Sequence, residues 1–109
     1  MRFASTLMIA VALLGASARA DATDEKVVQE ARARFVEGMQ RARSKDYEGA
    51  RLSFVEAYAV LKQRDVLFNL AFSEMMTKHP LEALAHFRAY DDDASLTEAS
   101  HAEARKYIA

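Results

Sequence analysis

The chain has 109 residues, which is enough for one small domain, and its formal charge is −1. It contains three glycines, one proline and no cysteine, so helix breakers are scarce and an all-helical chain is favoured. The absence of cysteine excludes disulfides, thiolate metal sites and cysteine nucleophiles, and the near-neutral charge does not suggest a nucleic-acid partner.

Residues 1–20 have the layout of a secretory signal peptide. Residues 3–14 are almost entirely apolar, and residues 18–20 form a small-x-small cleavage pattern, Ala-Arg-Ala. The apolar run is too short to span a membrane comfortably, although an uncleaved signal anchor is the alternative. We expect cleavage after Ala20, which leaves residues 21–109 as the mature domain. This domain would be periplasmic or secreted, with no stable membrane insertion.

Apolar residues at helical spacing predict a first helix, and Thr23 is placed to cap its start. The packing stripe of this helix is Val28, Ala31, Phe35, Gly38, Met39 and Ala42. A glycine in mid-helix costs about 1 kcal/mol relative to alanine, so Gly38 indicates that a neighbouring backbone comes close. Glu37 and Arg41 are spaced to form a favourable ion pair on the surface of the helix.

Residues 46–61 form the second predicted helix, with Asp46 as its N-cap after a short polar turn. Its packing side alternates large and small residues: Tyr47, Ala50, Phe54, Ala57, Tyr58 and Leu61. We expect Phe54 to be a wedge between neighbouring helices. The helix as a whole is expected to be scaffold, with recognition on the helices that it holds in place.

A third helix, capped by Asp65, is apolar around most of its circumference, so several neighbours or a bound partner should cover it. Pro80 fits the first position of a fourth helix, where its missing N–H does no harm. Three aspartates at residues 91–93 would oppose a helix dipole, so a loop is predicted there. Ser95 and Glu98 have the spacing of a capping box, which would open a fifth helix running to the chain end.

The pattern of residue sizes recurs between positions i and i+33 of the chain. The correspondences are Phe35 with Phe68, Gly38 with Ala71, Ala50 with Ala83, and Phe54 with Phe87. A period of about 34 residues with two helices per unit is typical of a helical solenoid.

The residues that recur resemble the tetratricopeptide repeat (TPR) family. That family marks its second helix with an aromatic residue, Ala, Phe and Ala, at the spacing of Tyr47, Ala50, Phe54 and Ala57. The resemblance implies two helix-turn-helix units, at about residues 31–63 and 64–96, and a capping helix at residues 97–109. The expected architecture is therefore an all-α, short α-solenoid. The chain also resembles small exported repeat proteins of Gram-negative bacteria.

In the TPR family the first helices of successive repeats line a concave groove that binds peptides. Carried over to this chain, the groove residues are Arg32, Val36, Met39 and Arg43 from the first repeat, and Asp65, Asn69, Phe72 and Met76 from the second. Such a surface is partly apolar, has adaptable methionines and suits an extended or helical peptide. For each residue the alternative is ordinary core or solvated surface.

Two further clusters are candidate metal sites. His79, Glu82 and His86 lie near one another on the fourth helix, but a closed zinc site normally needs four ligands and no other is evident. Residues 91–93 lack the glycine and the distal glutamate of a calcium loop. We therefore expect no metal and no cofactor, and no serine stands in a recognisable nucleophile motif.

The sequence thus predicts a non-enzymatic scaffold that binds a protein or peptide. The rival hypothesis is a structural subunit whose repeats stack in a homodimer or a larger complex. It arises because two repeats leave terminal faces open, whereas repeat arrays generally need about three units for stability.

Overall fold

The computed structural model describes residues 24–109, and this part of the chain is built from helices and turns alone. Residues 24–43 belong to the N-terminal helix, and four further helices follow: α2 (Tyr47–Val60), α3 (Arg64–Met76), α4 (Pro80–Asp91) and α5 (Glu98–Ile108). The predicted all-α fold is confirmed. The predicted signal peptide at residues 1–20, its cleavage after Ala20 and the cap at Thr23 lie outside the described residues.

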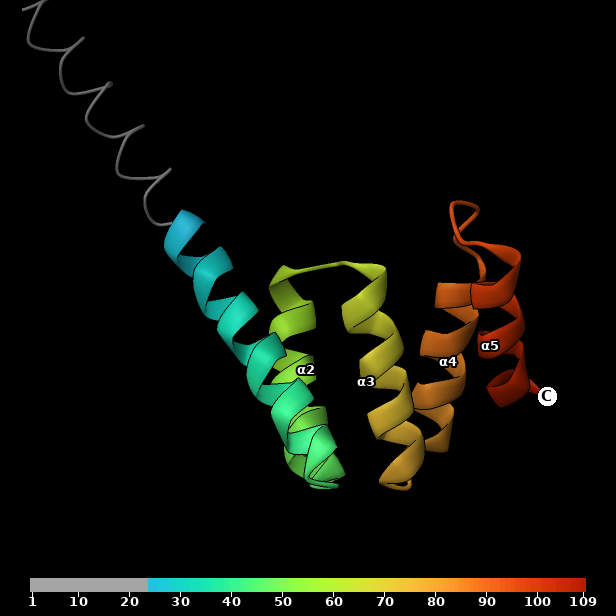
Figure 1. Ribbon diagram of the computed structural model, residues 1–109, viewed down its shortest axis with the longest axis horizontal. Coiled ribbons are helices and arrows are strands. Elements are labelled where there is room, and N and C mark those ends of the chain that lie inside the picture. Colours follow the sequence, from blue (N-terminus) through green and yellow to red (C-terminus); the bar gives the residue numbers. More distant parts are fainter. Residues whose placement is uncertain (1–23) are drawn as a thin grey trace, which may run out of the picture.

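Successive helices run in opposite directions and stand side by side in chain order (Figure 1). The N-terminal helix and α2 form one hairpin, and α3 and α4 form a second. The main helix contacts are made between sequence neighbours, since α2 packs on α3, α3 on α4, and α4 on α5. This arrangement of consecutive hairpins is consistent with a helical repeat.

The recurrence between positions i and i+33 is visible in the aromatic core. Phe35 and Phe54 place their ring centroids 5.7 Å apart, and the corresponding Phe68 and Phe87 place theirs 5.6 Å apart. Both Phe54 and Phe87 are fully buried. Each hairpin is therefore closed by the same pair of aromatic rings.

The same shift continues into α5. Gly38, Ala71 and Ala104 follow one another at the i, i+33 spacing, and all three are buried. A small residue at this point lets the helix approach its neighbour closely. By this criterion α5 occupies the place that the first helix of a third hairpin would take.

The two hairpin turns repeat as well. Lys45 and Lys78, related by the same shift, have φ values of 63° and 64°, in the left-handed region. Asp46 N–H donates to Arg41 O at 2.9 Å, and His79 N–H donates to Glu74 O at the same distance. Both helices thus end with the 6→1 hydrogen bond of a Schellman motif.

The helix ends confirm two of the predicted signals. The Asp46 side chain accepts a hydrogen bond from Gly49 N–H at 3.0 Å and caps α2. Pro80 occupies the first position of α4.

Two predicted boundaries are wrong. Asp65 does not cap α3, because Gln63 is the extended residue that precedes the helix and Asp65 already lies in its first turn. There its carboxylate still favours the positive end of the helix dipole. The loop predicted for residues 91–93 begins later than expected, since Asp91 is the last residue of α4 and Asp92 is its C-cap.

The predicted capping box at Ser95 is also wrong. Asp93 accepts hydrogen bonds from both the N–H and the hydroxyl of Ser95, at 2.9 and 2.6 Å. Ser95 is thereby held in the loop, and Thr97 caps α5 by accepting from Ser100 N–H at 3.2 Å.

Phe54 joins the two hairpins, as the sequence predicted. It forms a buried cluster with Ala50 of its own helix and Leu70 of α3. The partly buried residues packed against this cluster are Phe35, Met39, Ala42 and Tyr58. The ring therefore contacts the N-terminal helix on one side and α3 on the other.

Replacing Phe54 with alanine should lower the free energy of unfolding by about 3–5 kcal/mol, the usual range for a buried phenylalanine. Urea or thermal unfolding followed by circular dichroism measures the loss. Leu81, which is 78% exposed, provides the control, because Leu81→Ala should change stability by less than about 0.5 kcal/mol. A Phe54→Ala protein as stable as its parent would contradict the wedge.

Gly38 makes a close approach, but to a side chain rather than to the backbone that the sequence predicts. A methyl group placed on Gly38 would lie 2.6–2.9 Å from three carbons of the Phe54 ring. Because Phe54 is fully buried, its ring has little room to withdraw. The absence of a side chain at Gly38 therefore makes room for the wedge.

We accordingly expect Gly38→Ala to be destabilising, although alanine is the better helix former. Overpacking a core costs about 1–3 kcal/mol, which outweighs the gain of about 1 kcal/mol in helix propensity. The same change in a Phe54→Leu background should cost less, because the smaller side chain frees space. A Gly38→Ala protein more stable than its parent would show that the contact is not tight.

Candidate functional site

The four predicted groove residues of the N-terminal helix differ in exposure. Arg32 and Arg43 are exposed, and Val36 is 55% exposed, a large fraction for an aliphatic side chain. Met39 is half-buried and packs against the cluster around Phe54. Three of the four side chains are thus available to solvent, and the fourth is partly used by the core.

On α3, Asp65 is exposed and Met76 is 46% exposed. Asn69 is half-buried, and its side-chain amide donates to the backbone oxygen of Asp65 at 2.8 Å. Phe72 is also half-buried, because its ring makes edge contacts with Tyr47 and Tyr107, each at 6.1 Å between centroids. Asn69 and Phe72 are therefore largely engaged within the fold, and their role in a groove stays a prediction.

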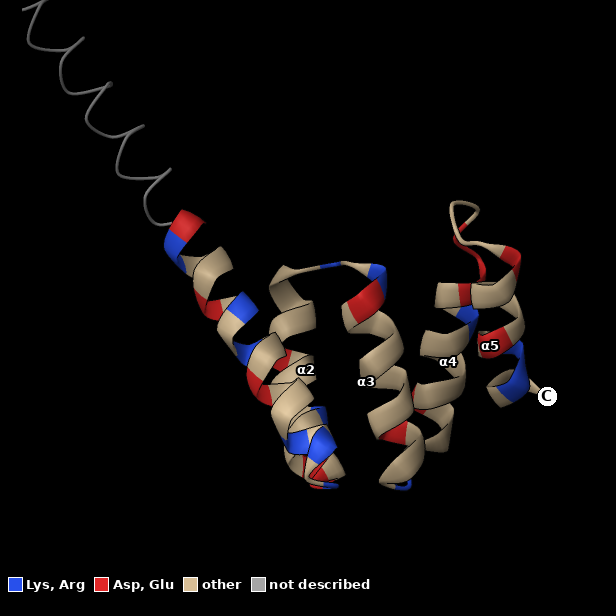
Figure 2. Ribbon diagram, viewed as in Figure 1, with Lys and Arg blue, Asp and Glu red and all other residues tan. Residues whose placement is uncertain are grey.

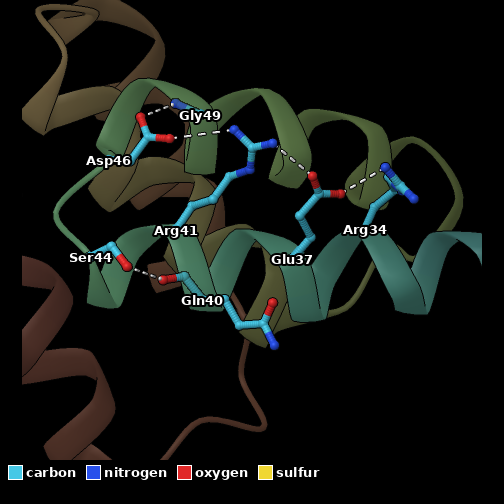
Figure 3. Close-up of polar contacts among 7 residues, drawn as sticks. All are labelled: Arg34, Glu37, Gln40, Arg41, Ser44, Asp46 and Gly49. Carbon is cyan, nitrogen blue, oxygen red and sulfur yellow. Dashed lines mark hydrogen bonds and ion pairs between the residues drawn. The ribbon is translucent and has the colours of Figure 1, made fainter.

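The arginines of the N-terminal helix fall into two classes. Arg34 and Arg41 both pair with Glu37, at 2.7 and 2.9 Å, which confirms the predicted Glu37–Arg41 pair. Arg41 also reaches Asp46 at 3.4 Å, so a continuous chain of charges links this helix to the cap of α2 (Figure 3). Within residues 24–109, Arg32 and Arg43 form no ion pair with a carboxylate.

Arg32 and Arg43 stand out in the distribution of charge along the described chain. Figure 2 shows charges along the whole N-terminal helix, whereas much of α3 and α4 is uncharged. A cation that already pairs with a neighbouring carboxylate has fewer free donors for a partner. Arg32 and Arg43 have no such carboxylate partner within residues 24–109, and they lie four and seven positions from the exposed Val36.

The two histidines considered as zinc ligands are directed to different carboxylates. His86 Nδ1 lies 2.6 Å from Glu74 Oε1, and Glu74 is almost fully buried between the helices. His79 Nε2 lies 4.0 Å from Glu48 of α2. In the described part of the chain, no group of three histidine, aspartate or glutamate side chains is arranged to hold a metal ion.

Glu48 belongs to a second charged contact on α2. It forms an ion pair with Arg51, whose hydrogen bond lowers the pKa of the Glu48 carboxyl and raises the pKa of the Arg51 guanidinium. The Glu48–Arg51 pair lies within α2, whereas the contacts of His79 with Glu48 and of His86 with Glu74 connect neighbouring helices.

A polar contact also holds α5 against α4. His101 Nδ1 donates to Asp91 Oδ1 at 2.8 Å, and Arg105 donates to the other oxygen of Asp91 at 3.3 Å. The hydrogen bond from His101 holds the pKa of Asp91 below its usual value, and Arg105 acts in the same direction, while desolvation opposes both. The aspartate predicted to lie in a solvated loop is therefore a docking point for the last helix.

This lowered pKa makes the contribution of Asp91 dependent on pH. A carboxylate whose folded-state pKa is depressed stabilises the fold above its unfolded pKa of about 3.9 and loses that effect as the pH falls through the folded value. We expect Asp91→Asn to be less stable than the parent at pH 7. The two proteins should become equally stable once the pH is below the folded-state pKa of Asp91. Unfolding measured from pH 7 to pH 2 tests the prediction. A constant difference at every pH would contradict it.

A furrow runs between the N-terminal helix and α2 on the face that begins the row of helices. Its larger hollow, of about 430 Å³, is lined by Val27, Glu30, Ala31, Arg34, Glu56 and Val60. A smaller hollow, of about 150 Å³, is lined by Arg34, Glu37, Arg41, Gly49, Leu52, Ser53 and Glu56. Arg34 and Glu56 border both hollows, so the two adjoin.

We call this surface the terminal face, defined by the residues that line the two hollows. The sequence does not predict this face, because the pattern of α2 indicates a scaffold helix only. Leu52 and Val60 are 53% and 40% exposed, and Val27 is 42% exposed. One signal in the sequence could have revealed the face. Leu52 and Val60 lie outside the packing side of α2, at positions where a solvated helix normally carries polar or charged residues.

Comparison with known proteins adds no identification, since no family model, curated protein or solved structure matches this chain. No helix within residues 24–109 has both the length and the apolar character needed to cross a membrane. Function must therefore be argued from the surfaces described above.

Proposed function

We propose that the chain is a non-enzymatic scaffold of the TPR type that binds a protein or peptide segment along its first helices. The observation that carries the proposal is the stripe formed by Arg32, Val36 and Arg43. An aliphatic side chain stands more than half exposed between two arginines that have no carboxylate partner in the described chain. One helix face thereby offers a partner an apolar contact and two cations together.

The chemistry of the stripe indicates the kind of segment that would fit. Val36 offers an apolar contact, and Arg32 and Arg43 offer charge-assisted hydrogen bonds to carboxylates. Met76 of α3 adds a flexible apolar side chain that adapts to different partners. A segment with an apolar anchor flanked by acidic groups satisfies all of these residues.

Export to the periplasm belongs to the same proposal. It rests on the signal-peptide pattern of residues 1–20 and on the resemblance of the repeat to small exported bacterial proteins. The arrangement of consecutive hairpins supports the TPR assignment, since the aromatic pair, the small residue and the turn all recur with the same shift along the chain.

Self-assembly is the second candidate function. The observation that favours it is the terminal face, where three aliphatic side chains are 40–53% exposed next to a furrow. Such a face buries its apolar area only by contact with another helix.

A peptide-display selection tests the groove without knowledge of the natural partner. Peptides selected on the parent protein should bind the Val36→Asp/Met76→Asp variant more than about tenfold more weakly, because two buried charges replace two apolar contacts. Leu81→Asp is the control, since Leu81 is exposed and lies outside the groove. Equal binding to the parent and to the groove variant would rule out the proposal.

The arginines supply a second comparison. Arg32→Glu/Arg43→Glu should abolish binding of acidic peptides, whereas Arg34→Glu/Arg41→Glu changes the same number of charges on the same helix but at arginines that already pair with Glu37 and, for Arg41, also with Asp46. If both double variants weakened binding equally, only the net charge of the helix would matter and the stripe would have no specific role.

A further inference from the structure

The second hairpin shows what covers the equivalent of the terminal face inside the molecule. By the shift from i to i+33, Glu37 corresponds to Leu70 and Ser53 corresponds to His86. Leu70 is buried in a cluster with Ala50 and Phe54 of α2, and the His86 ring lies 6.1 Å from the ring of Tyr58, also on α2. In the second hairpin, α2 therefore packs on the edge of this face that holds Leu70 and His86, whereas Ala85 and Ala89, the equivalents of Leu52 and Glu56, are exposed.

In the first hairpin the same face carries a mixed surface. Toward the turn, the chain of charges from Arg34 to Asp46 makes the face polar, as in the polar cap of a repeat array. Farther along α2, Leu52 and Val60 remain exposed, and Val27 faces the same furrow. This half therefore leaves three aliphatic side chains open to solvent beside the furrow.

The residues of α2 on this face are arranged symmetrically. Leu52 and Val60 each lie four positions from Glu56, one turn before it and one turn after it, so all three share one side of the helix. Two antiparallel copies of α2 related by a two-fold axis near Glu56 would therefore place Leu52 of each copy opposite Val60 of the other.

The charges complement this pairing. Arg34 borders the furrow beside Glu56, and within the described residues Glu56 forms no ion pair with a cation. Two Glu56 carboxylates near one axis repel each other unless each meets a cation from the opposite copy. Arg34 meets that need, because its guanidinium has five donors and its contact with Glu37 leaves donors free.

We propose that the terminal face pairs with the terminal face of a second copy, forming a closed two-fold dimer through Leu52, Glu56 and Val60 of α2 and Arg34 of the N-terminal helix. A two-fold contact uses the same face on both copies and leaves none free, so assembly stops at two chains. The inference rests on the self-assembly candidate and names its partner and register, and the groove residues Arg32, Val36 and Met76 take no part in it.

Sedimentation equilibrium of the protein expressed from the whole sequence tests the pairing. The parent should be a dimer, and Leu52→Asp and Val60→Asp should each raise the dimer dissociation constant by more than about tenfold, since each buries a charge at the centre of the contact. Val36→Asp is the matched control, because Val36 is at least as exposed but lies on the groove stripe. It should leave the constant within about twofold of the parent value. Circular dichroism confirms that each variant is folded.

A charge exchange tests the register of the two copies. Glu56→Arg alone should weaken the dimer, because it places four arginines around the axis, and Arg34→Glu/Glu56→Arg should restore it. Failure of the double variant to recover would overturn the proposed cross-pairing.

Two other results would overturn the dimer itself. One is a parent protein that stays monomeric at about 1 mM, where even a weak dimer is populated. The other is a dimer broken by Val36→Asp and not by Leu52→Asp, which would place the contact in the groove. A monomer that still captures displayed peptides through the groove would show that the dimer proposal had failed while the peptide-binding proposal survived.

Discussion

The fold depends on one steric constraint, the entry of the Phe54 ring into the space left by Gly38. This contact fixes the distance between the N-terminal helix and α2, and the other side of the ring meets Leu70 of α3. The repeat of the motif at Phe87 and Ala71 fixes the second hairpin by the same means. With both rings packed, the other main contacts are those between helices that are neighbours in sequence. The surfaces available for recognition are the residues that the wedges leave uncovered.

The sequence predicted the parts of the structure that depend on residue size and spacing. The knobs and holes of α2, the cap at Asp46 and the recurrence between i and i+33 are all readable because large, small and capping residues have distinct side chains. The left-handed turn residues could not be predicted, since lysine occupies both positions where glycine is the usual signal. The start of α5 was misplaced because both Ser95 and Thr97 are good caps, and only the capture of Ser95 by Asp93 decides between them.

The groove residues show where sequence reasoning has less power. Spacing assigns Arg32 and Asn69 to one helix face each, but it does not say which of the two side chains makes contacts within the fold. In the structure Asn69 bonds to its own helix and Phe72 fills a gap between Tyr47 and Tyr107, whereas Arg32 and Val36 stay open. The terminal face was missed for a related reason. The helix α2 carries two apolar stripes, and the one with the aromatic residues dominates the sequence pattern and hides the weaker aliphatic one.

The order in which the helices pack has a kinetic consequence. Because the main contacts join neighbours in sequence, little chain entropy must be lost before each new contact forms, and folding should be fast for a chain of this length. Such a row of helices also comes apart from its ends, as one-dimensional repeat arrays do. The end formed by α5 rests on Tyr107, Ala104 and the tie to Asp91, whereas the opposite end is anchored by two phenylalanines. Local opening should therefore start at α5, and amide hydrogens there should exchange with solvent before those of α2.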